Sequence, residues 1–347
     1  MLTSDTSTSN RFVFNTQLFA EQVERISKTT LNSFKQITLQ YSLFQIAFFA
    51  LGVVELFAFV LFFSYLTKST IFAFSIAGLF FTGFAYFVLL FYFQAKKPQQ
   101  LLQLRHVFIN ECKTALPFEA SSPEYHLALI EALYHLVAQF HRQEYNYYKT
   151  PEALETLSLL AQKFSVWTHW KDVHQMKELL IHMIIKEYIH LVQLKPTDLE
   201  THAGLASAYL SLSKLYTDPR KVTPDEPHIW VSPEYGSHEL QDKFKNASHR
   251  AIEELRILDA YSPNDPWVHI KLATIYQHLN MTHEEINEYE TILTLSPKDQ
   301  TTLFRLGALY FSQGQHATAL RLYERLMPIN SSKAEELLTY YGTSFNE

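Results

Sequence analysis

A single apolar block limits what this chain can fold into. Residues 36–95 are 60 consecutive positions in which Glu55 and Lys68 carry the only charges, and 15 of the 27 phenylalanines lie there. A helix that crosses the ~30 Å hydrocarbon core of a bilayer needs ~20 apolar residues. The block divides into two such stretches, Leu43 to Leu66 and Ile71 to Phe93. Two membrane-spanning helices are therefore predicted; a buried pair in a soluble core is the alternative.

The two spans are predicted to form a tight antiparallel hairpin, because the linker Thr67–Thr70 is short and polar. Lys and Arg residues mark the cytoplasmic flanks of membrane helices. We therefore expect both termini on the cytoplasmic side and an uncleaved first span. The flanking basic residues are Arg11, Arg25, Lys28 and Lys35 before the hairpin, and Lys96, Lys97 and Arg105 after it, against Lys68 alone in the linker.

Glu55 lies near the middle of the first span, where an ionised carboxylate is costly and a partner is expected. Antiparallel registration brings Glu55 level with Thr82 of the second span. Small and polar residues on the facing sides suit close helix packing in lipid. We predict that Glu55 is protonated and hydrogen-bonded across the hairpin or between copies of the chain.

The N-terminal arm, residues 1–40, is expected to begin disordered, since six of its first ten residues are Ser or Thr. Apolar residues then recur at helical spacing among basic ones from Leu18 to Ile37. This amphipathic helix either lies on an anionic membrane surface or packs on the soluble part of the protein. The hairpin itself occupies residues 41–95.

Residues 96–195 have the three- and four-residue apolar spacing of helices. Helices are predicted near 99–115, 123–148, 152–165 and 169–194, with Pro98, Pro123 and Pro151 at or beside helix starts and Pro196 after an end. The region is either a set of degenerate repeats or a separate bundle. The whole chain is predicted to be all-α.

Residues 196–347 contain a 34-residue period, which indicates a repeat architecture. The registered pairs are Pro263 and Pro297, Leu272 and Leu306, Ala273 and Gly307, Tyr276 and Tyr310, Tyr289 and Tyr323, and Ile292 and Leu326. This pattern resembles the tetratricopeptide repeat, in which small residues let paired helices approach. A further repeat is split: Leu205, Ala206 and Tyr209 match the first helix, and Ala251, Leu255 and Leu258 match the second. Glu285 departs from the pattern where a small residue is expected.

The resemblance implies that the predicted transmembrane hairpin is followed by an α-solenoid with a concave groove that binds a peptide or helix of a partner protein. A helix from Lys333 to Tyr341 is expected to cap the array, and the proline-rich insertion at 214–236 to cover the groove as a lid through Trp230 and Tyr235. The groove surface should be apolar and aromatic, with few basic residues. The predicted groove residues are Trp267, Ile270, Lys271, Thr274, Gln277, His278, Phe304, Arg305 and Phe311.

Catalytic and cofactor sites have no support in the sequence. The chain has sixteen histidines but no HExxH and no Cys/His ligand spacing, and it lacks a Walker loop, GxGxxG and GxSxG. The single cysteine, Cys112, has no thiol partner. The net charge of −6 argues against nucleic-acid binding. We expect no enzyme activity, no metal and no cofactor.

Three functions remain open. The first is a membrane-anchored scaffold that recruits a protein through the groove, either as a single chain or as a homo-oligomer held by the hairpin. The second is a secreted bacterial effector, because the closely spaced hairpin and the Ser/Thr-rich start resemble those of chlamydial inclusion membrane proteins. The third is a small channel or transporter component that uses Glu55. The corresponding membranes are a bacterial inner membrane or a host inclusion membrane.

Overall fold

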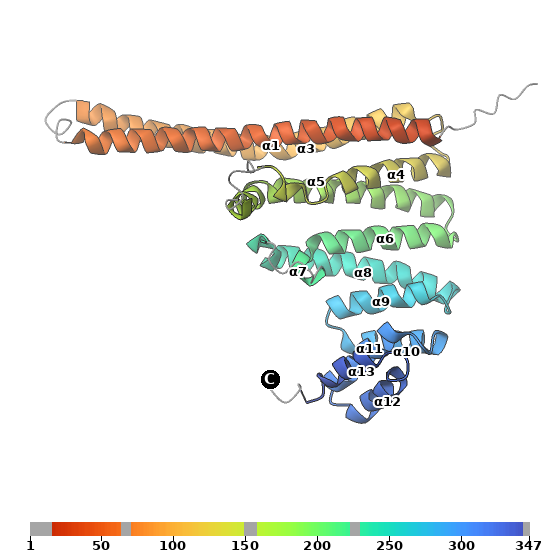
Figure 1. Ribbon diagram of the computed structural model, residues 1–347. Helices are drawn as coiled ribbons and strands as arrows, with labels where there is room; N and C mark the ends of the chain where they lie inside the picture. Colours follow the sequence, from red (N-terminus) through yellow and green to blue (C-terminus); the bar gives the residue numbers. More distant parts are fainter. Residues whose placement is uncertain (1–15, 64–70, 149–157, 223–229, 343–347) are drawn as a thin grey trace, which may run out of the picture. The chain divides into compact units, whose positions relative to one another are not determined.

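The computed structural model describes residues 16–63, 71–148, 158–222 and 230–342 (Figure 1). Every regular element within these ranges is a helix, which confirms the all-α prediction. The chain divides into two compact units. The first contains Met1–Glu187 together with Glu226–Ser232, and the second contains Tyr188–Asp225 and Pro233–Glu347.

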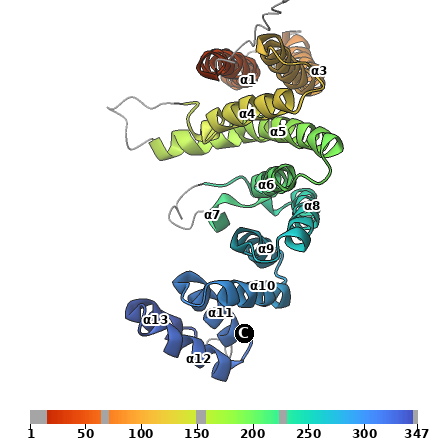
Figure 2. The ribbon, with the colours of Figure 1, turned by 90° about the vertical axis from the view of Figure 1, so that its right-hand side faces the viewer.

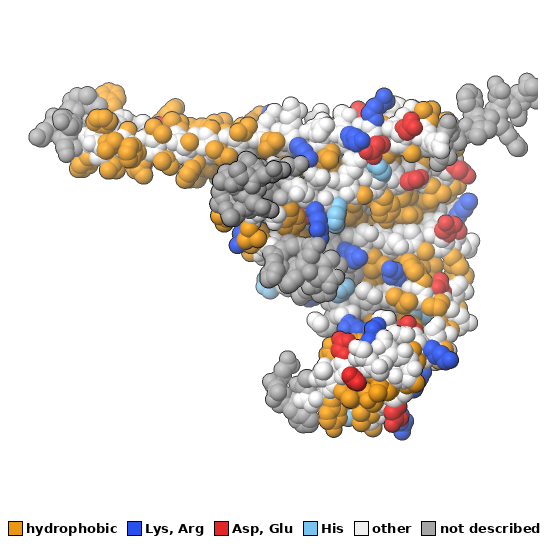
Figure 3. Space-filling view, viewed as in Figure 1, with side chains coloured by type: hydrophobic (Ala, Val, Ile, Leu, Met, Phe, Trp, Pro, Cys, Tyr) orange, Lys and Arg blue, Asp and Glu red, His pale blue; other side chains and the backbone are white. Residues whose placement is uncertain are grey.

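Two long helices dominate the first unit. α1 (Thr16–Leu61) and α3 (Ile71–Ala115) have 46 and 45 residues and lie side by side (Figures 1 and 2). Each is long and apolar enough to cross a membrane, and none of either apolar window is buried. Figure 3 shows hydrophobic side chains along the projecting part of the pair. A soluble core pair would bury these residues, so that alternative is not supported. The predicted linker, Thr67–Thr70, lies outside the described residues.

The prediction that a helix starts at Pro98 is wrong, because Pro98 lies inside α3. A proline within a helix cannot donate its backbone hydrogen bond to the carbonyl four residues earlier, here that of Gln94. Gln94 is exposed and follows the predicted end of the span at Phe93. Water can therefore solvate the freed carbonyl at this level, and the helix continues without a break.

The N-terminal arm is part of α1, and its apolar face packs on α4 (Pro123–Gln139). Phe34 is fully buried, and its ring lies 4.9 Å from that of Phe140. Phe19 and Val23 are also buried. Of the two interpretations of the arm, packing on the rest of the protein is the one observed, so this face does not lie on a membrane. The predicted disorder of the first ten residues falls outside the described residues.

The region after the hairpin has fewer helices than predicted. α4 begins at Pro123 behind the N-cap Ser122 but ends at Gln139, because Arg142 adopts a left-handed conformation with φ 56°. A short 3-10 helix, η1 (Gln143–Tyr145), follows. The helices predicted near 152–165 and 169–194 are one helix, α5 (Ser158–Leu194). No proline or glycine interrupts α5; residues 149–157 lie outside the described residues.

The second unit consists of paired helices joined by short turns. α6 pairs with α8, α9 with α10 and α11 with α12, and each pair also contacts the next. Two apolar clusters form the core, one centred on Leu255, Leu272 and Tyr276 and one on Leu306, Phe311 and Leu337. The helices are α6 (Leu199–Tyr216), α7 (Pro219–Val222), η3 (Pro233–Gly236), α8 (His238–Tyr261), α9 (Pro266–His278), α10 (Thr282–Leu295), α11 (Gln300–Ser312), α12 (His316–Leu326) and α13 (Ser331–Leu338).

The small residues of the 34-residue period lie where helices meet. Ala273 and Ala319 are fully buried. A Cβ added to Gly307 would lie 2.7 Å from Leu337 Cδ2 of α13. The capping helix therefore packs directly on the backbone of α11, and this contact requires glycine. The cap is shorter than predicted, ending at Leu338 instead of Tyr341.

Candidate functional site

The predicted groove is best formed on α9, where apolar side chains remain accessible. Trp267 is 36% exposed and Ile270 is 47% exposed. The Lys271 ammonium lies 5.7 Å from the centre of the Trp267 ring, within cation–π range. Thr274 and His278 are half-buried and Gln277 is exposed. This helix therefore offers an aromatic anchor beside one positive charge and several polar groups.

The α11 part of the predicted groove is largely covered by the protein itself. The prediction that Phe311 lines the groove is wrong: Phe311 is fully buried, with Tyr341 and His316 rings at 5.6 and 5.9 Å. Phe304 is half-buried and lies 6.0 Å from the Tyr340 ring. The chain after α13 returns across this helix. The 34-residue period could not reveal this, because the C-terminal turn lies outside the repeat.

Arg305 is engaged by α10 and is not a free groove cation. Its guanidinium is close enough to the Tyr289 hydroxyl and the Glu285 carboxyl to oppose the burial that raises the pKa of both groups. Glu285 is 3% exposed, and burial raises the pKa of its carboxyl despite the opposing charge of Arg305. Glu285, which departs from the repeat pattern, thus has the charge of Arg305 nearby, but its Oε1 is buried without a hydrogen-bond partner among the described residues.

The candidate lid residues lie on either side of the unit boundary. Trp230 belongs to the first unit, and its backbone carbonyl accepts a hydrogen bond of 3.2 Å from the Tyr145 hydroxyl. Tyr235 belongs to η3 of the second unit and is half-buried. Residues 223–229 lie outside the described residues. Closure of the insertion over the groove stays a prediction.

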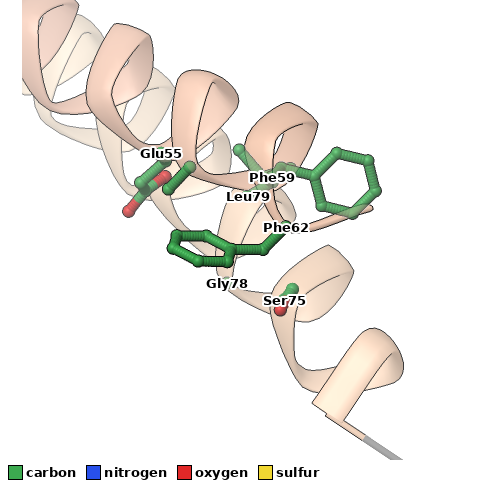
Figure 4. Close-up of a pocket in the computed structure, with 7 residues that line it drawn as sticks. Glu55, Phe59, Phe62, Ser75, Gly78 and Leu79 are labelled. Carbon is green, nitrogen blue, oxygen red and sulfur yellow. The ribbon is translucent and has the colours of Figure 1, made fainter. Parts of the chain in front are cut away.

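The structure brings Glu55 and Thr82 together in the hairpin. Thr82 Oγ1 donates a hydrogen bond of 2.8 Å to Glu55 Oε1. The second carboxyl oxygen, Oε2, is buried without a hydrogen-bond partner among the described residues. Glu55 lines a cavity of about 350 Å³ between the two helices, together with Ala58, Phe59, Phe62, Ser75, Gly78 and Leu79 (Figure 4). Within the hairpin, one of the two carboxyl oxygens of Glu55 therefore has a hydrogen-bond partner and the other does not.

Two histidines that are missing from the predicted sites each connect a helix pair to the turn before it. His202 Nδ1 lies 2.7 Å from Glu254 Oε2, and its Nε2 lies 3.0 Å from the Pro196 carbonyl. His269 repeats this arrangement with Glu288 at 2.7 Å and the Pro263 carbonyl at 2.9 Å. In each case the histidine joins the second helix of its own pair to the turn before it.

The pKa values of both histidines are raised above the ordinary range. Burial lowers the pKa of His202, but the hydrogen bonds to Glu254 and to the Pro196 carbonyl outweigh it. Burial also lowers the pKa of His269, and the Pro263 carbonyl and Glu288 outweigh it. Both arrangements therefore favour imidazolium over neutral imidazole.

We refer to these two histidine–glutamate contacts as the His–Glu clamps. The sequence contains a signal for them. Each histidine follows its proline by six residues, and each glutamate precedes the next proline by nine. Glu187 also precedes Pro196 by nine residues, and His126 Nδ1 of α4 lies 2.6 Å from Glu187 Oε2. The first unit thus contains a His–Glu contact with the same glutamate offset, joining α4 to α5. His126 itself does not share the six-residue offset, because it follows Pro123 by three residues.

The part of the chain that the structure describes contains no candidate site for metal binding or thiol chemistry. No group of three or more His, Cys, Asp or Glu side chains is placed to hold a metal ion there. Cys112 is buried, and burial, with a smaller contribution from Glu111, raises the pKa of its thiol to about 12. Such a thiol is a poor nucleophile at neutral pH.

The observations define a class: an all-helical protein with two long apolar helices followed by a helical repeat region. No family model and no curated protein matches the chain. Among solved structures 19 chains match. One is described as "MamA RS-1 ArsTM double mutant", with 12% identity and a TM-score of 0.31 over 68% of this chain and 96% of that one. A likeness at this level carries no conclusion about function.

Proposed function

We propose that this protein is a membrane-anchored scaffold of the tetratricopeptide type, which recruits a protein partner to one face of a bilayer. The observation that carries the proposal is the accessible Trp267–Ile270 surface on a repeat helix of a chain that also has an apolar hairpin. Neither feature requires the protein to perform chemistry. An array of this kind acts by binding, and the hairpin determines where it binds.

The tetratricopeptide assignment is supported by where the pattern residues pack. Leu272, Ala273 and Tyr276 are each 2% exposed or less, and the equivalent Leu306, Gly307 and Tyr310 are also buried. Residues at the same offsets thus form the contacts between helices. Trp267 and Ile270 occupy the remaining face of α9, which packing inside the unit does not use.

The partner surface is expected to be apolar with an acidic group nearby. Exposed tryptophans anchor protein interfaces because they bury a large area with few rotatable bonds. Lys271, over the Trp267 ring, adds one positive charge. An amphipathic helix or an extended apolar peptide with a carboxylate at its edge fits this surface.

Anchoring supplies the mechanism. A scaffold confined to a membrane raises the effective concentration of its partner at that surface without any new contact. The basic residues that flank the hairpin support a cytoplasmic position for both termini. Under this proposal the protein has no reaction of its own.

Photo-crosslinking in native membranes tests the proposal. A photoreactive amino acid at Trp267 should capture a discrete protein, whereas the same group at Leu320, which is 38% exposed on α12, should not. The variant Ile270→Asp should abolish capture from a second groove position such as Gln277. Equal labelling from Trp267 and Leu320 would contradict the proposal, and capture of the Trp230 segment alone would show a closed groove.

A further inference from the structure

The first turns of α5 carry an apolar surface that the rest of the first unit leaves open. Trp167 is 72% exposed, Leu160 59% and Phe164 42%. Their spacing of four and three residues places them on one face of the helix. Leu159, 53% exposed, lies beside them. We refer to these four residues as the α5 patch.

The opposite face of the same turns is buried, which fixes the direction of the patch. Ser165 Oγ donates a hydrogen bond of 2.6 Å to the Glu144 carbonyl and accepts one of 3.2 Å from the Tyr147 amide. The His169 ring stacks on Tyr147 with 3.9 Å between ring centres. The helix cannot rotate to bury Trp167 without breaking these contacts.

These contacts also connect the start of α5 to the point where the hairpin becomes apolar. Thr38 Oγ1 lies 3.2 Å from the Tyr147 hydroxyl. The Lys97 ammonium lies 2.5 Å from Asp172 Oδ2 and 5.1 Å from the centre of the Tyr41 ring. In sequence, Thr38 and Tyr41 shortly precede the predicted start of the first span at Leu43, and Lys97 follows the end of the second at Phe93.

The direction of α5 carries the patch toward the membrane side of this junction. Figure 1 shows the N-terminal end of α5 on the side from which the apolar part of α1 and α3 projects. A helix rises about 1.5 Å per residue, so Leu160 lies roughly 18 Å from Asp172 along the helix. The patch therefore reaches the level at which the hydrocarbon region begins.

The charges around the patch suit a lipid surface. Residues 158–171 contain Lys163 and Lys171 but no Asp or Glu, and both lysines are exposed. Tryptophan favours the membrane–water interface, and lysines there can reach headgroup phosphates. Residues 158–171 of α5 thus combine an apolar cluster with two exposed lysines, a composition that suits the membrane–water interface.

We propose that Leu159, Leu160, Phe164 and Trp167 form an interfacial lipid contact, which seats the base of the first unit on the same bilayer that the hairpin spans. This inference rests on the membrane anchoring in the proposed function. It goes beyond that anchoring because it assigns a second, peripheral contact to a helix outside the hairpin. That contact restricts tilting of the first unit about the hairpin.

Site-specific fluorescence on the full-length protein in vesicles tests the contact. Cys112→Ala removes the one native thiol, and an environment-sensitive probe is attached to Phe164→Cys. Matched positions are Leu127→Cys, 50% exposed on α4, and Phe80→Cys, 75% exposed within the predicted second span. The vesicles contain phosphatidylcholine and phosphatidylglycerol, with nitroxide-labelled lipid carrying the label near the headgroup or deep in the acyl chain.

The expected result is a blue-shifted emission at 164 that headgroup-level nitroxide quenches at least twofold, with little quenching at 127. The probe at 80 should be quenched best by the deep nitroxide. An unquenched probe at 164 beside a quenched probe at 80 would overturn the lipid contact and leave the anchor intact. Loss of quenching at 80 would overturn the anchor itself. A blue shift at 164 without quenching would show that a second copy of the protein, and not lipid, covers the patch; a probe at Leu160→Cys repeats the measurement.

Discussion

At the scale of single residues, the His–Glu clamps are the clearest example of chemistry repeated with the fold. His202 and His269 each bond a glutamate and a turn carbonyl, so each joins three segments through one ring. At the same offsets the last repeat has Leu303 and Leu322, which lie in its apolar core. A buried polar pair and an apolar pair thus occupy equivalent places.

The clamps predict a pH dependence of stability in the second unit. Because the folded-state pKa values of His202 and His269 are raised, their contribution is fully present below the unfolded-state value and decreases as pH rises through the folded-state value. Hydrogen exchange of the α9 amides should therefore be slower, after correction for intrinsic rates, at about pH 6 than at about pH 8.

The double variant His269→Leu with Glu288→Leu, which copies the last repeat, should reduce this pH dependence. His249→Gln, at an exposed position on α8, serves as the control and should retain it. The same slope in all three proteins would show that the clamps do not titrate in this range.

The residue scale also shows where sequence reasoning is reliable. The period identified Leu272, Ala273 and Tyr276 as packing residues because each depends on contacts within neighbouring repeats. It assigned Phe311 to the groove by the same logic, and failed because the covering ring of Tyr341 comes from outside the repeat. The Glu55–Thr82 contact could be predicted from the sequence, because a short linker constrains which residues of the two antiparallel helices face each other.

At the scale of elements, the predicted boundaries failed where one helix continues through a position that usually ends one. Pro98 is tolerated inside α3 because the carbonyl that it leaves without a backbone donor, that of Gln94, belongs to an exposed residue. α5 continues through Ser165 and Thr168: the Ser165 hydroxyl bonds the distant Glu144 carbonyl, the Thr168 hydroxyl bonds the Phe164 carbonyl one turn earlier, and neither interrupts the helix. The local spacing of apolar residues predicts which segments are helical, whereas the continuity of a helix depends on the solvent and the neighbouring groups around each of its turns.

The capping helix gives a prediction at this scale. Gly307→Val should displace α13, because even a Cβ would lie 2.7 Å from Leu337 Cδ2. Overpacking of this kind costs about 1–3 kcal/mol, which thermal or denaturant unfolding of the detergent-solubilised protein can measure. Gly236→Ala, where an added Cβ meets nothing within 4 Å, should have little effect. A similar change in both variants would mean that α13 does not pack tightly on α11.

The hairpin gives a second prediction at the scale of elements, because one oxygen of the Glu55 carboxyl group has no hydrogen-bond partner among the described residues. Two copies inserted in one orientation place Glu55 at the same depth, and open space at Gly52 and Gly78 allows close helix approach. We expect self-association, and Glu55→Leu should weaken it by about 1–2 kcal/mol, or roughly 5- to 30-fold. Energy transfer between labelled copies in bilayers measures the dissociation constant.

Crosslinking then locates the interface. With Cys112 replaced by Ala, Ala58→Cys beside the cavity should form disulfides between copies, whereas Val60→Cys, 64% exposed, should not. Monomeric energy-transfer behaviour of the native sequence at high protein-to-lipid ratio would exclude the pairing. The cavity would then contain lipid.

At the scale of the whole molecule, two kinds of physical constraint operate on one chain. If the hairpin spans a bilayer as proposed, it is constrained by the cost of unpaired backbone groups in hydrocarbon, which continuous helices avoid. The second unit is constrained by nearest-neighbour packing of repeated helix pairs. Both signals are local in sequence, so the sequence predicted the fold class. The His126–Glu187 contact joins residues 61 positions apart, and no local pattern predicted that α4 and α5 would meet.

Membrane topology is the prediction that concerns the molecule as a whole. An antiparallel hairpin places the residues before the first predicted span and after the second on one side of the membrane, and the excess of Lys and Arg there predicts that this side is cytoplasmic. In the Cys112→Ala background, single cysteines at Leu18 and Tyr341, 54% and 57% exposed, should react with a membrane-impermeant maleimide only in vesicles whose cytoplasmic face is outside. A cysteine at Ser69 should show the opposite pattern. Reaction of all three from the same side would mean that the apolar pair does not cross the bilayer. Reaction of Leu18 and Tyr341 from opposite sides would require an odd number of crossings, which two antiparallel spans cannot provide.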